Sequence, residues 1–174
     1  MLLARPFVKA EFTKVRKLKI LSRPFTTSGR ILFLPEKGLV WQTLKPIEDT
    51  LLISLDGVSQ IKKDNPNPIK IKNPVVKSAS TVFITVLSLD LDRIKAIFTI
   101  QEGTLTKDKK SYTLVPKDET LKKVIQYIEL SGKDRVERIH IQELSGDSTT
   151  VRLENETFDK SGFSSTERQL LELM

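Results

Sequence analysis

The chain has 174 residues, 39% of them hydrophobic, and its 29 Lys and Arg against 22 Asp and Glu give a formal net charge of +7. This length can bury a real core, so we expect one domain over residues 1–174. The absence of cysteine excludes disulfides, thiolate metal sites and cysteine nucleophiles. The basic balance suits a nucleic acid, an anionic membrane surface or an acidic partner, and it is also typical of solvated strand faces.

The start of the chain shows no export signal, and no apolar run reaches the roughly 20 residues that span a bilayer. Met1 to Ala4 lead almost at once into a strand-like pattern. We therefore expect that an export signal has been removed ahead of this sequence.

The first half of the chain is predicted to form antiparallel strands. Alternating side chains indicate a long first strand over Phe7 to Ile20, which Ser22-Arg23-Pro24 ends. Further strands are expected at residues 27–34, 38–44, 50–55 and 58–62. Asp64 to Pro68 is typical of a loop, and Ile69 to Lys72 of a short edge strand.

Residues 78–98 change to helical spacing, with Ser78 or Ser80 as the expected N-cap. A break at Leu89-Asp90 is expected, after which Asp90 caps a second short helix. Strands then return at residues 97–104, 111–116, 121–130, 135–143 and 149–154. The tail over Ser164 to Met174 is predicted to be a short helix or disordered.

These elements predict an α+β fold. A strongly curved sheet of about ten strands should form an open, incomplete antiparallel β-barrel, because curling limits the exposed edges of so many consecutive strands. The helical segment would then serve as a lid over its concave side.

The hairpin from Ser28 to Pro46 is the most informative segment. Its strands are apolar on consecutive residues, Ile31 to Leu34 and Leu39 to Trp41. A half-buried antiparallel strand should alternate apolar with polar residues, so this hairpin needs cover on both faces. Ordinary core explains any one of these residues. Together they favour an apolar cavity under a lid, the usual form of a lipophile site.

Catalytic, metal and cofactor sites are poorly supported. His140 is the only histidine and is predicted to be a solvent-facing strand residue, with no nucleophile placed beside it. Asp90 and Asp92 are explained by helix capping, and no glycine-rich phosphate loop is present. We therefore expect a non-enzymatic protein without a cofactor or a metal.

Several short motifs, in order, resemble the outer-membrane lipoprotein carrier family, LolA. They are Phe12-Thr13-Lys14, Ser28-Gly29, Leu39-Val40-Trp41, Pro46, Leu52-Ile53-Ser54 with Asp56-Gly57, and Leu114 to Lys117. The similarity runs from about residue 7 to residue 154. It implies a periplasmic, monomeric carrier that shields acyl chains of lipoproteins or other lipids between sheet and lid.

The same resemblance implies a donor and an acceptor. Cargo would come from an inner-membrane lipid or lipoprotein exporter and pass to an outer-membrane acceptor, with transient membrane contact. The predicted cavity lining is Phe12, Leu32, Leu39, Trp41, Ile53, Phe83, Leu87 and Phe98. The choice of inward face is open, because a slip of one residue exchanges the two faces of a strand.

The chain departs from the family pattern in three places. The arginine that holds the family's lid shut falls at Pro35, so that latch is absent or is replaced by Arg30 or Lys37. The family's C-terminal strand is missing, and Phe158 to Met174 differs from it. Most of the family's first helix, ahead of Phe7, is also absent from the sequence given.

The alternative function is a basic adaptor that binds an acidic partner or nucleic acid on its surface, without a lipid cavity. Stacking on nucleic-acid bases needs exposed aromatic rings. Phe33, Trp41 and Phe83 are instead embedded in apolar runs, so we expect no nucleic-acid partner.

Overall fold

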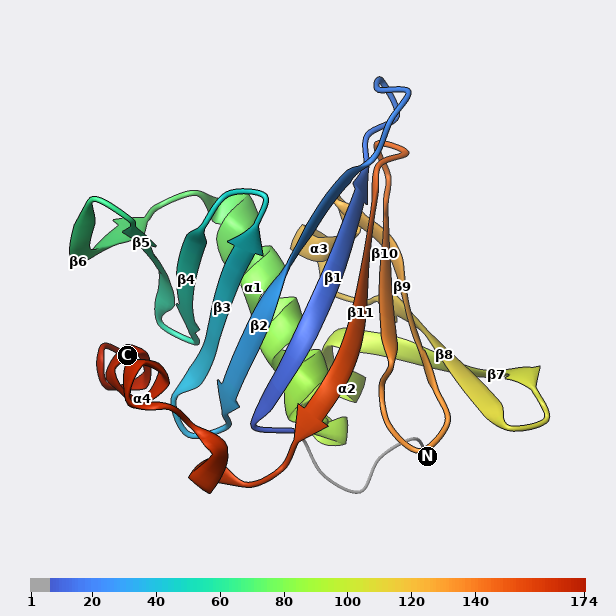
Figure 1. Cartoon of the computed structure of the whole chain (residues 1–174). Coiled ribbons are helices and arrows are strands. Elements are labelled where there is room, and N and C mark those ends of the chain that lie inside the picture. The colour runs from blue at the N-terminus through green and yellow to red at the C-terminus, as the bar shows by residue number, and fades with distance from the viewer. Residues whose placement is uncertain (1–6) are drawn as a thin grey trace. The chain divides into compact units, whose positions relative to one another are not determined.

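The computed structural model describes residues 7–174, so the expectation of a removed export signal ahead of Met1 to Ala4 concerns a segment outside the described residues. Within these residues, eleven strands form one antiparallel sheet in the order β6-β5-β4-β3-β2-β1-β11-β10-β9-β8-β7 (Figure 1). β6 and β7 end this order with one neighbour each, so the sheet is open.

The chain packs as two compact units. Residues 7–12, 27–88 and 155–174 form one of them, here named the α1 unit. Residues 13–26 and 89–154 form the other, named the α2 unit. The expectation of a single domain stays a prediction.

The α1 unit holds the N-terminal half of the sheet and the C-terminal helix. Its elements are the start of β1 (Lys9–Lys17), most of β2 (Phe25–Leu34), β3 (Gly38–Lys45), β4 (Asp49–Ser54), β5 (Gly57–Lys62), β6 (Asn65–Ile71), α1 (Pro74–Ser88), the end of β11 (Ser148–Thr157), a 3-10 helix (Lys160–Gly162) and α4 (Ser165–Glu172). The turn between β2 and β3 requires glycine at Gly38, where φ is +133° and a Cβ would lie 2.2 Å from the Ile53 carbonyl oxygen.

The register of β2, β3 and β4 sorts their apolar residues onto two faces. Ile31 pairs with Trp41, Leu32 with Val40, Phe33 with Leu39, and Leu39 with Ile53. Successive side chains of a strand point to opposite faces. One face, named the α1 face, therefore carries Ile31, Phe33, Leu39, Trp41 and Ile53. The other, named the α4 face, carries Leu32, Leu34, Val40 and Leu52.

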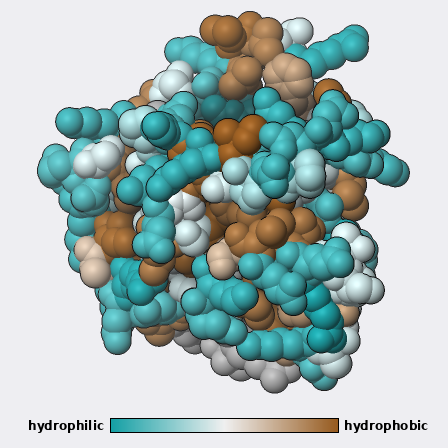
Figure 2. Space-filling model, turned by 90° about the vertical axis from the view of Figure 1, so that its left-hand side faces the viewer, coloured by the Kyte–Doolittle hydropathy of each residue, from teal (hydrophilic) through white to brown (hydrophobic). Residues whose placement is uncertain are grey.

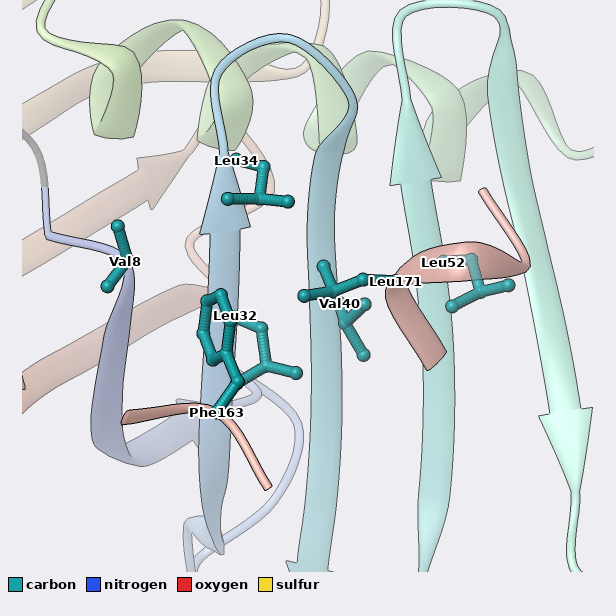
Figure 3. Packing of buried hydrophobic residues seen from close by; sticks show 7 residues of the cluster. All are labelled: Val8, Leu32, Leu34, Val40, Leu52, Phe163 and Leu171. Atoms are coloured by element: carbon teal, nitrogen blue, oxygen red, sulfur yellow. The ribbon is translucent and has the colours of Figure 1, made fainter. Parts of the chain in front are cut away.

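Both faces are covered by helical segments. Phe83 of α1 contacts Trp41 on the α1 face, with ring centroids 5.2 Å apart. On the α4 face, Phe163 and Leu171 pack with Leu32, Val40 and their neighbours in one buried cluster (Figure 3). The prediction that this hairpin has cover on both faces is confirmed.

The α2 unit consists of the C-terminal half of the sheet and two short helices. It contains most of β1 and of β11, the hairpin turn between β1 and β2, α2 (Leu91–Ile97), β7 (Phe98–Thr106), β8 (Lys109–Pro116), α3 (Glu119–Lys122), β9 (Ile125–Gly132) and β10 (Arg138–Glu143). Its buried residues include Phe98, Leu114, Ile128, Ile139 and Val151. α2 contacts β7, and α3 contacts β8 and β9.

Three local predictions were wrong. The segment predicted as a loop is part of β6, which accommodates Pro66 and Pro68 because it is an edge strand that needs few backbone donors. The long helix begins at Pro74 rather than after Ser78 or Ser80, and proline suits a first helical turn. The start of the strand predicted over residues 121–130 is instead α3, which Asp118 caps.

Two other local predictions are confirmed. The helical region breaks at Leu89, whose φ is +55°, and the Asp90 carboxylate accepts a hydrogen bond from the Arg93 backbone N–H at 3.1 Å. The tail forms the short helix α4. Within residues 7–174, no helix is long and apolar enough to cross a membrane.

Candidate binding face

Three aromatic rings lie in a row between the sheet and α1. The Phe12 and Trp41 ring centroids are 4.4 Å apart, and Trp41 meets Phe83 edge-on, with 64° between the ring planes. Phe12 and Trp41 are buried, and Phe83 is half-buried. Tilted and edge-on pairs at such distances are favourable for aromatic rings. The α1 face, with Phe12 of β1 and Phe83 of α1 packed against its Trp41, is thus part of an aromatic and aliphatic layer.

The structure brings six of the eight predicted lining residues to this region. Leu39, Trp41 and Ile53 share the α1 face, and Phe12 packs against Trp41. Phe83 contacts Trp41 from the helix, and the buried Leu87 lies one helical turn further on, on the same side of α1.

The other two predicted residues lie elsewhere. Leu32 points to the α4 face, one residue out of phase with Ile31 and Phe33, and packs in the cluster of Phe163 and Leu171. Phe98 is buried in the α2 unit, where it starts β7 opposite Pro116. The lining role of the six that converge stays a prediction, developed below.

α1 depends on burial for its stability. Val, Ile and Thr make up seven of its 15 residues, and these β-branched side chains lower helix propensity. Its first turn contains no acidic residue and its last turn no basic residue, so charged side chains do not complement the helix dipole. The hydroxyl oxygen of Thr85 is buried and has no hydrogen-bond partner within the part of the chain described. Such a group costs about 1–3 kcal/mol.

The opposite side of the sheet is organised around a buried carboxylate that sequence reasoning missed. Glu167 of α4 has no exposed side-chain surface and accepts contacts from Lys9 and Arg30, each at 2.8 Å. Its other oxygen accepts the backbone N–H of Ser164 at 2.9 Å, which completes a capping box with the Ser164 hydroxyl. The spacing from Ser164 to Glu167 is a capping signal that can be read in the sequence. The two cationic partners, Lys9 and Arg30, lie far from Glu167 in the sequence, on β1 and β2.

The charge balance of this cluster favours ionised Glu167. Burial opposes ionisation, but the hydrogen bonds from Lys9 and Ser164 and the charges of Lys9 and Arg30 outweigh it and lower the pKa of Glu167. Arg30 also donates to the Gln42 side chain at 2.6 Å. α4 is thereby fixed to both β1 and β2 by charged contacts.

Both residues proposed as substitutes for the missing latch arginine contact α4. Arg30 binds Glu167, and the Lys37 ammonium donates to the Leu171 carbonyl at 3.1 Å, near the C-terminal end of the helix. These contacts lie on the α4 face, so in this conformation the two cations hold the C-terminal helix.

A small cavity lies at the free end of α4. It has a volume of about 190 Å³ and is lined by Leu52, Ser54, Asp56, Gly57, Val58, Ser59, Lys70, Leu173 and Met174. Pockets for drug-sized ligands usually measure about 300–1,000 Å³. With its small volume and mixed polar lining, this cavity does not suit an acyl chain.

His140 has a structural environment. Its Nδ1 lies 2.8 Å from the Thr150 hydroxyl, and its ring stands 6.2 Å from that of Tyr127. Burial, followed by the charge of Arg138, lowers the pKa of His140 and favours the neutral imidazole. The ring is thus packed and hydrogen-bonded along its strand.

Comparison with known proteins gives a fold but no close relative. No protein-family model matches the sequence, and no curated protein matches it. A LolA superfamily protein from Nitrosomonas europaea superposes with a TM-score of 0.52 at 8% identity, over 90% of this chain and 87% of that one. This likeness shows the fold alone, and it confirms the predicted open, incomplete barrel with a helical lid.

Two further solved structures match with lower scores. An outer-membrane lipoprotein-sorting domain from Vibrio parahaemolyticus has a TM-score of 0.47 at 10% identity, over 94% of this chain and 91% of that one. LprF from Mycobacterium bovis has a TM-score of 0.42 at 15% identity, over 86% and 85%.

Proposed function

We propose that this chain, a divergent protein with the LolA-like fold, is a carrier that binds the acyl chains of lipoproteins or other lipids between the sheet and α1. The single observation that carries this proposal is the row formed by Phe12, Trp41 and Phe83, which joins an apolar sheet face to a helix weakly stabilised by its own sequence.

The energetics of such a site are simple. Each methylene moved from water into an apolar environment gains about 0.8 kcal/mol, so an acyl chain supplies affinity without any precisely placed polar group. The α1 face offers that kind of surface through Leu39, Trp41 and Ile53, which are buried in this structure. A ligand would enter by separating Phe83 from Trp41, and would replace contacts between side chains with contacts to its own chain.

α1 is the element expected to move. The sheet side of the site is fixed by the backbone ladders of β2, β3 and β4. α1 has no such ladder, and neither its first nor its last turn carries a charge that complements its dipole. Its buried Thr85 hydroxyl finds no hydrogen-bond partner among residues 7–174. Lifting this helix costs mainly the burial that an acyl chain would restore.

The setting proposed for this carrier is the periplasm, where lipid anchors must cross water. An exporter at the inner membrane would load it and an outer-membrane acceptor would unload it, with the carrier acting as a monomer. The fold shared with the LolA superfamily protein from Nitrosomonas europaea supports this setting.

The direct test is native mass spectrometry of the protein isolated from cells that export it, before and after delipidation. We expect a bound lipid that delipidation removes and that an added fatty acid replaces. Phe83→Ser should reduce the occupied fraction, because it removes the ring that closes over Trp41. Ile61→Ser is the matched control, since Ile61 is also partly buried but packs against the α4 face. Absence of lipid in the untreated protein, or equal loss in both variants, would refute the proposal.

A further inference from the structure

The end of the β1–β2 hairpin exposes an unusual group of apolar side chains. Ile20 is 89% exposed, Leu21 45% and Phe25 54%. Leu144, 57% exposed, belongs to the turn between β10 and β11. We name residues 17–25 together with Leu144 the apolar tip. Its brown cluster stands at the top of Figure 2, where the hairpin ends in Figure 1.

The two turns of the apolar tip are held together by hydrogen bonds. The Lys19 backbone N–H donates to the Asp147 carboxylate at 2.8 Å. Arg16 contacts the Glu143 carboxylate and donates to the Thr149 hydroxyl at 2.8 Å. The β1–β2 hairpin that carries these apolar side chains is thus held against the β10–β11 hairpin by hydrogen bonds.

The charge of the tip is strongly one-sided. Residues 17–25 include Lys17, Lys19 and Arg23, all exposed, and no acidic residue. Two acidic residues lie nearby, and both form ion pairs with Arg16. One is Glu143, and the other is Asp147, whose carboxylate lies 3.7 Å from the Arg16 guanidinium. The cations at the end of the hairpin therefore face solvent beside Ile20 and Leu21.

Single exposed apolar residues are ordinary on protein surfaces and need no explanation. Leu105, 52% exposed on β7 near the turn to β8, is such a residue. The apolar tip differs because aliphatic, aromatic and cationic side chains gather there in a few consecutive residues. Segments that lie in a membrane interface combine apolar side chains, which enter the acyl boundary, with Lys and Arg at headgroup level.

We propose that the apolar tip docks this protein onto a bilayer surface rich in anionic lipid. Ile20 and Leu21 enter the interface, with Phe25 and Leu144 at its rim. Lys17, Lys19 and Arg23 lie among the lipid phosphates, whose negative potential attracts them. The chemistry favours a bilayer over nucleic acid, because three of the four exposed apolar side chains are aliphatic and only Phe25 offers a ring for base stacking.

This docking surface is independent of the acyl-chain site. It lies within the α2 unit, whereas the α1 face belongs to the α1 unit. A carrier would use it to approach the membrane at which cargo is exchanged. Its failure and the failure of the carrier proposal are separately measurable, since vesicle binding and fatty-acid binding are different assays.

The test is flotation with vesicles of two parts phosphatidylcholine to one part phosphatidylglycerol, and with vesicles of phosphatidylcholine alone. The wild type is expected to float with the anionic vesicles and far less with the neutral ones. Ile20→Ser/Leu21→Ser should weaken binding by at least about tenfold, because two apolar side chains no longer enter the interface. Lys17→Gln/Lys19→Gln/Arg23→Gln should weaken it about fivefold for each charge removed.

The matched control is Leu105→Ser/Lys107→Gln, which removes an exposed leucine and a neighbouring exposed lysine from the β7–β8 hairpin. It should bind anionic vesicles like the wild type, and all variants should keep the wild-type Tm because the altered residues are exposed. A wild type that fails to float, or a tip variant with both Ile20 and Leu21 replaced that floats normally, would overturn the proposal. Binding to single-stranded DNA in place of vesicles, lost in the charge variant, would also overturn it.

Discussion

Replacing Glu167 by Gln is the most informative change on the α4 face. Glu167 is fully buried, and its carboxylate accepts from Lys9 and Arg30 at 2.8 Å and from the Ser164 backbone N–H at 2.9 Å. Gln keeps the shape but loses the charge. Its amide group also places N–H donors where the site presents only donors.

The expected cost follows from these contacts. Removing one partner of a buried charged pair costs about 3–5 kcal/mol when the remaining charge is fully buried. The side chains of Lys9 and Arg30 keep 28% and 26% exposure, so water partly rehydrates them after the substitution. We therefore expect Glu167→Gln to lower the free energy of unfolding by about 2–3 kcal/mol. In a chain of this length, that loss lowers Tm by roughly 5–10 °C.

Thermal unfolding followed by circular dichroism measures the global effect, and hydrogen exchange of the amides over residues 165–172 measures the docking of α4. Glu172→Gln is the matched control, because Glu172 lies on the same helix and is exposed. A Tm for Glu167→Gln within a degree or so of the control, with unchanged exchange in α4, would refute the importance of the charge cluster.

The remaining predictions concern pH, backbone packing and the α1 face. The lowered pKa of Glu167 means that its ionised form stabilises the fold above the ordinary carboxyl pKa and that this stability is lost as pH falls through the folded pKa. Acidification from neutrality to about pH 3 should therefore destabilise the wild type more than Glu167→Gln in parallel denaturant titrations. Gly29→Ala should lower the free energy of unfolding by about 3 kcal/mol, because a Cβ there would lie 1.9 Å from the Gln42 carbonyl oxygen of β3. An unchanged midpoint of urea unfolding would contradict this. Phe83→Ala should move Trp41 emission to longer wavelength, whereas Phe163→Ala should lower stability without that shift; equal emission changes would contradict the assignment of the two faces.

Much of the regular structure could be predicted from local signals. Alternation located most strands, and the change to helical spacing located the helical region, including its break at Leu89. Only the end of β6 was predicted, as an edge strand beginning at Ile69. Its start was taken as a loop because Pro66 and Pro68 normally interrupt strands, and only the position of β6 at the edge of the sheet permits them. That position depends on long-range pairing and is not visible in the segment itself.

The sequence predicted that the candidate site is apolar, but not which residues of each strand point toward it. Residues 31–34 and 39–41 are all apolar, so periodicity could not decide which of them face the same way. The register set by the turn at Gly38 places Leu39 and Trp41 on the α1 face and Leu32 on the α4 face. A continuous apolar run predicts two covered faces without assigning its residues to either one.

The second cover came from a segment whose role the sequence did not indicate. The pair formed by Arg30 and Glu167 joins residues 137 positions apart, and the Lys37 contact to Leu171 joins residues 134 apart. Only the local capping box at Ser164 was readable in advance. The need for a second cover was thus predictable, but the identity of the helix that supplies it was not.

Acyl-chain binding at the α1 face is measured most directly by titrating the delipidated protein with a long-chain fatty acid and following Trp41 emission at low and at high salt. Trp41 is the only tryptophan and lies between Phe12 and Phe83 on the proposed binding face. An acyl-chain carrier should show a saturable emission change with an affinity that salt barely weakens, because burial of methylenes drives binding. No saturable change, or binding that collapses as salt is added, would contradict an acyl-chain carrier and favour an electrostatic adaptor.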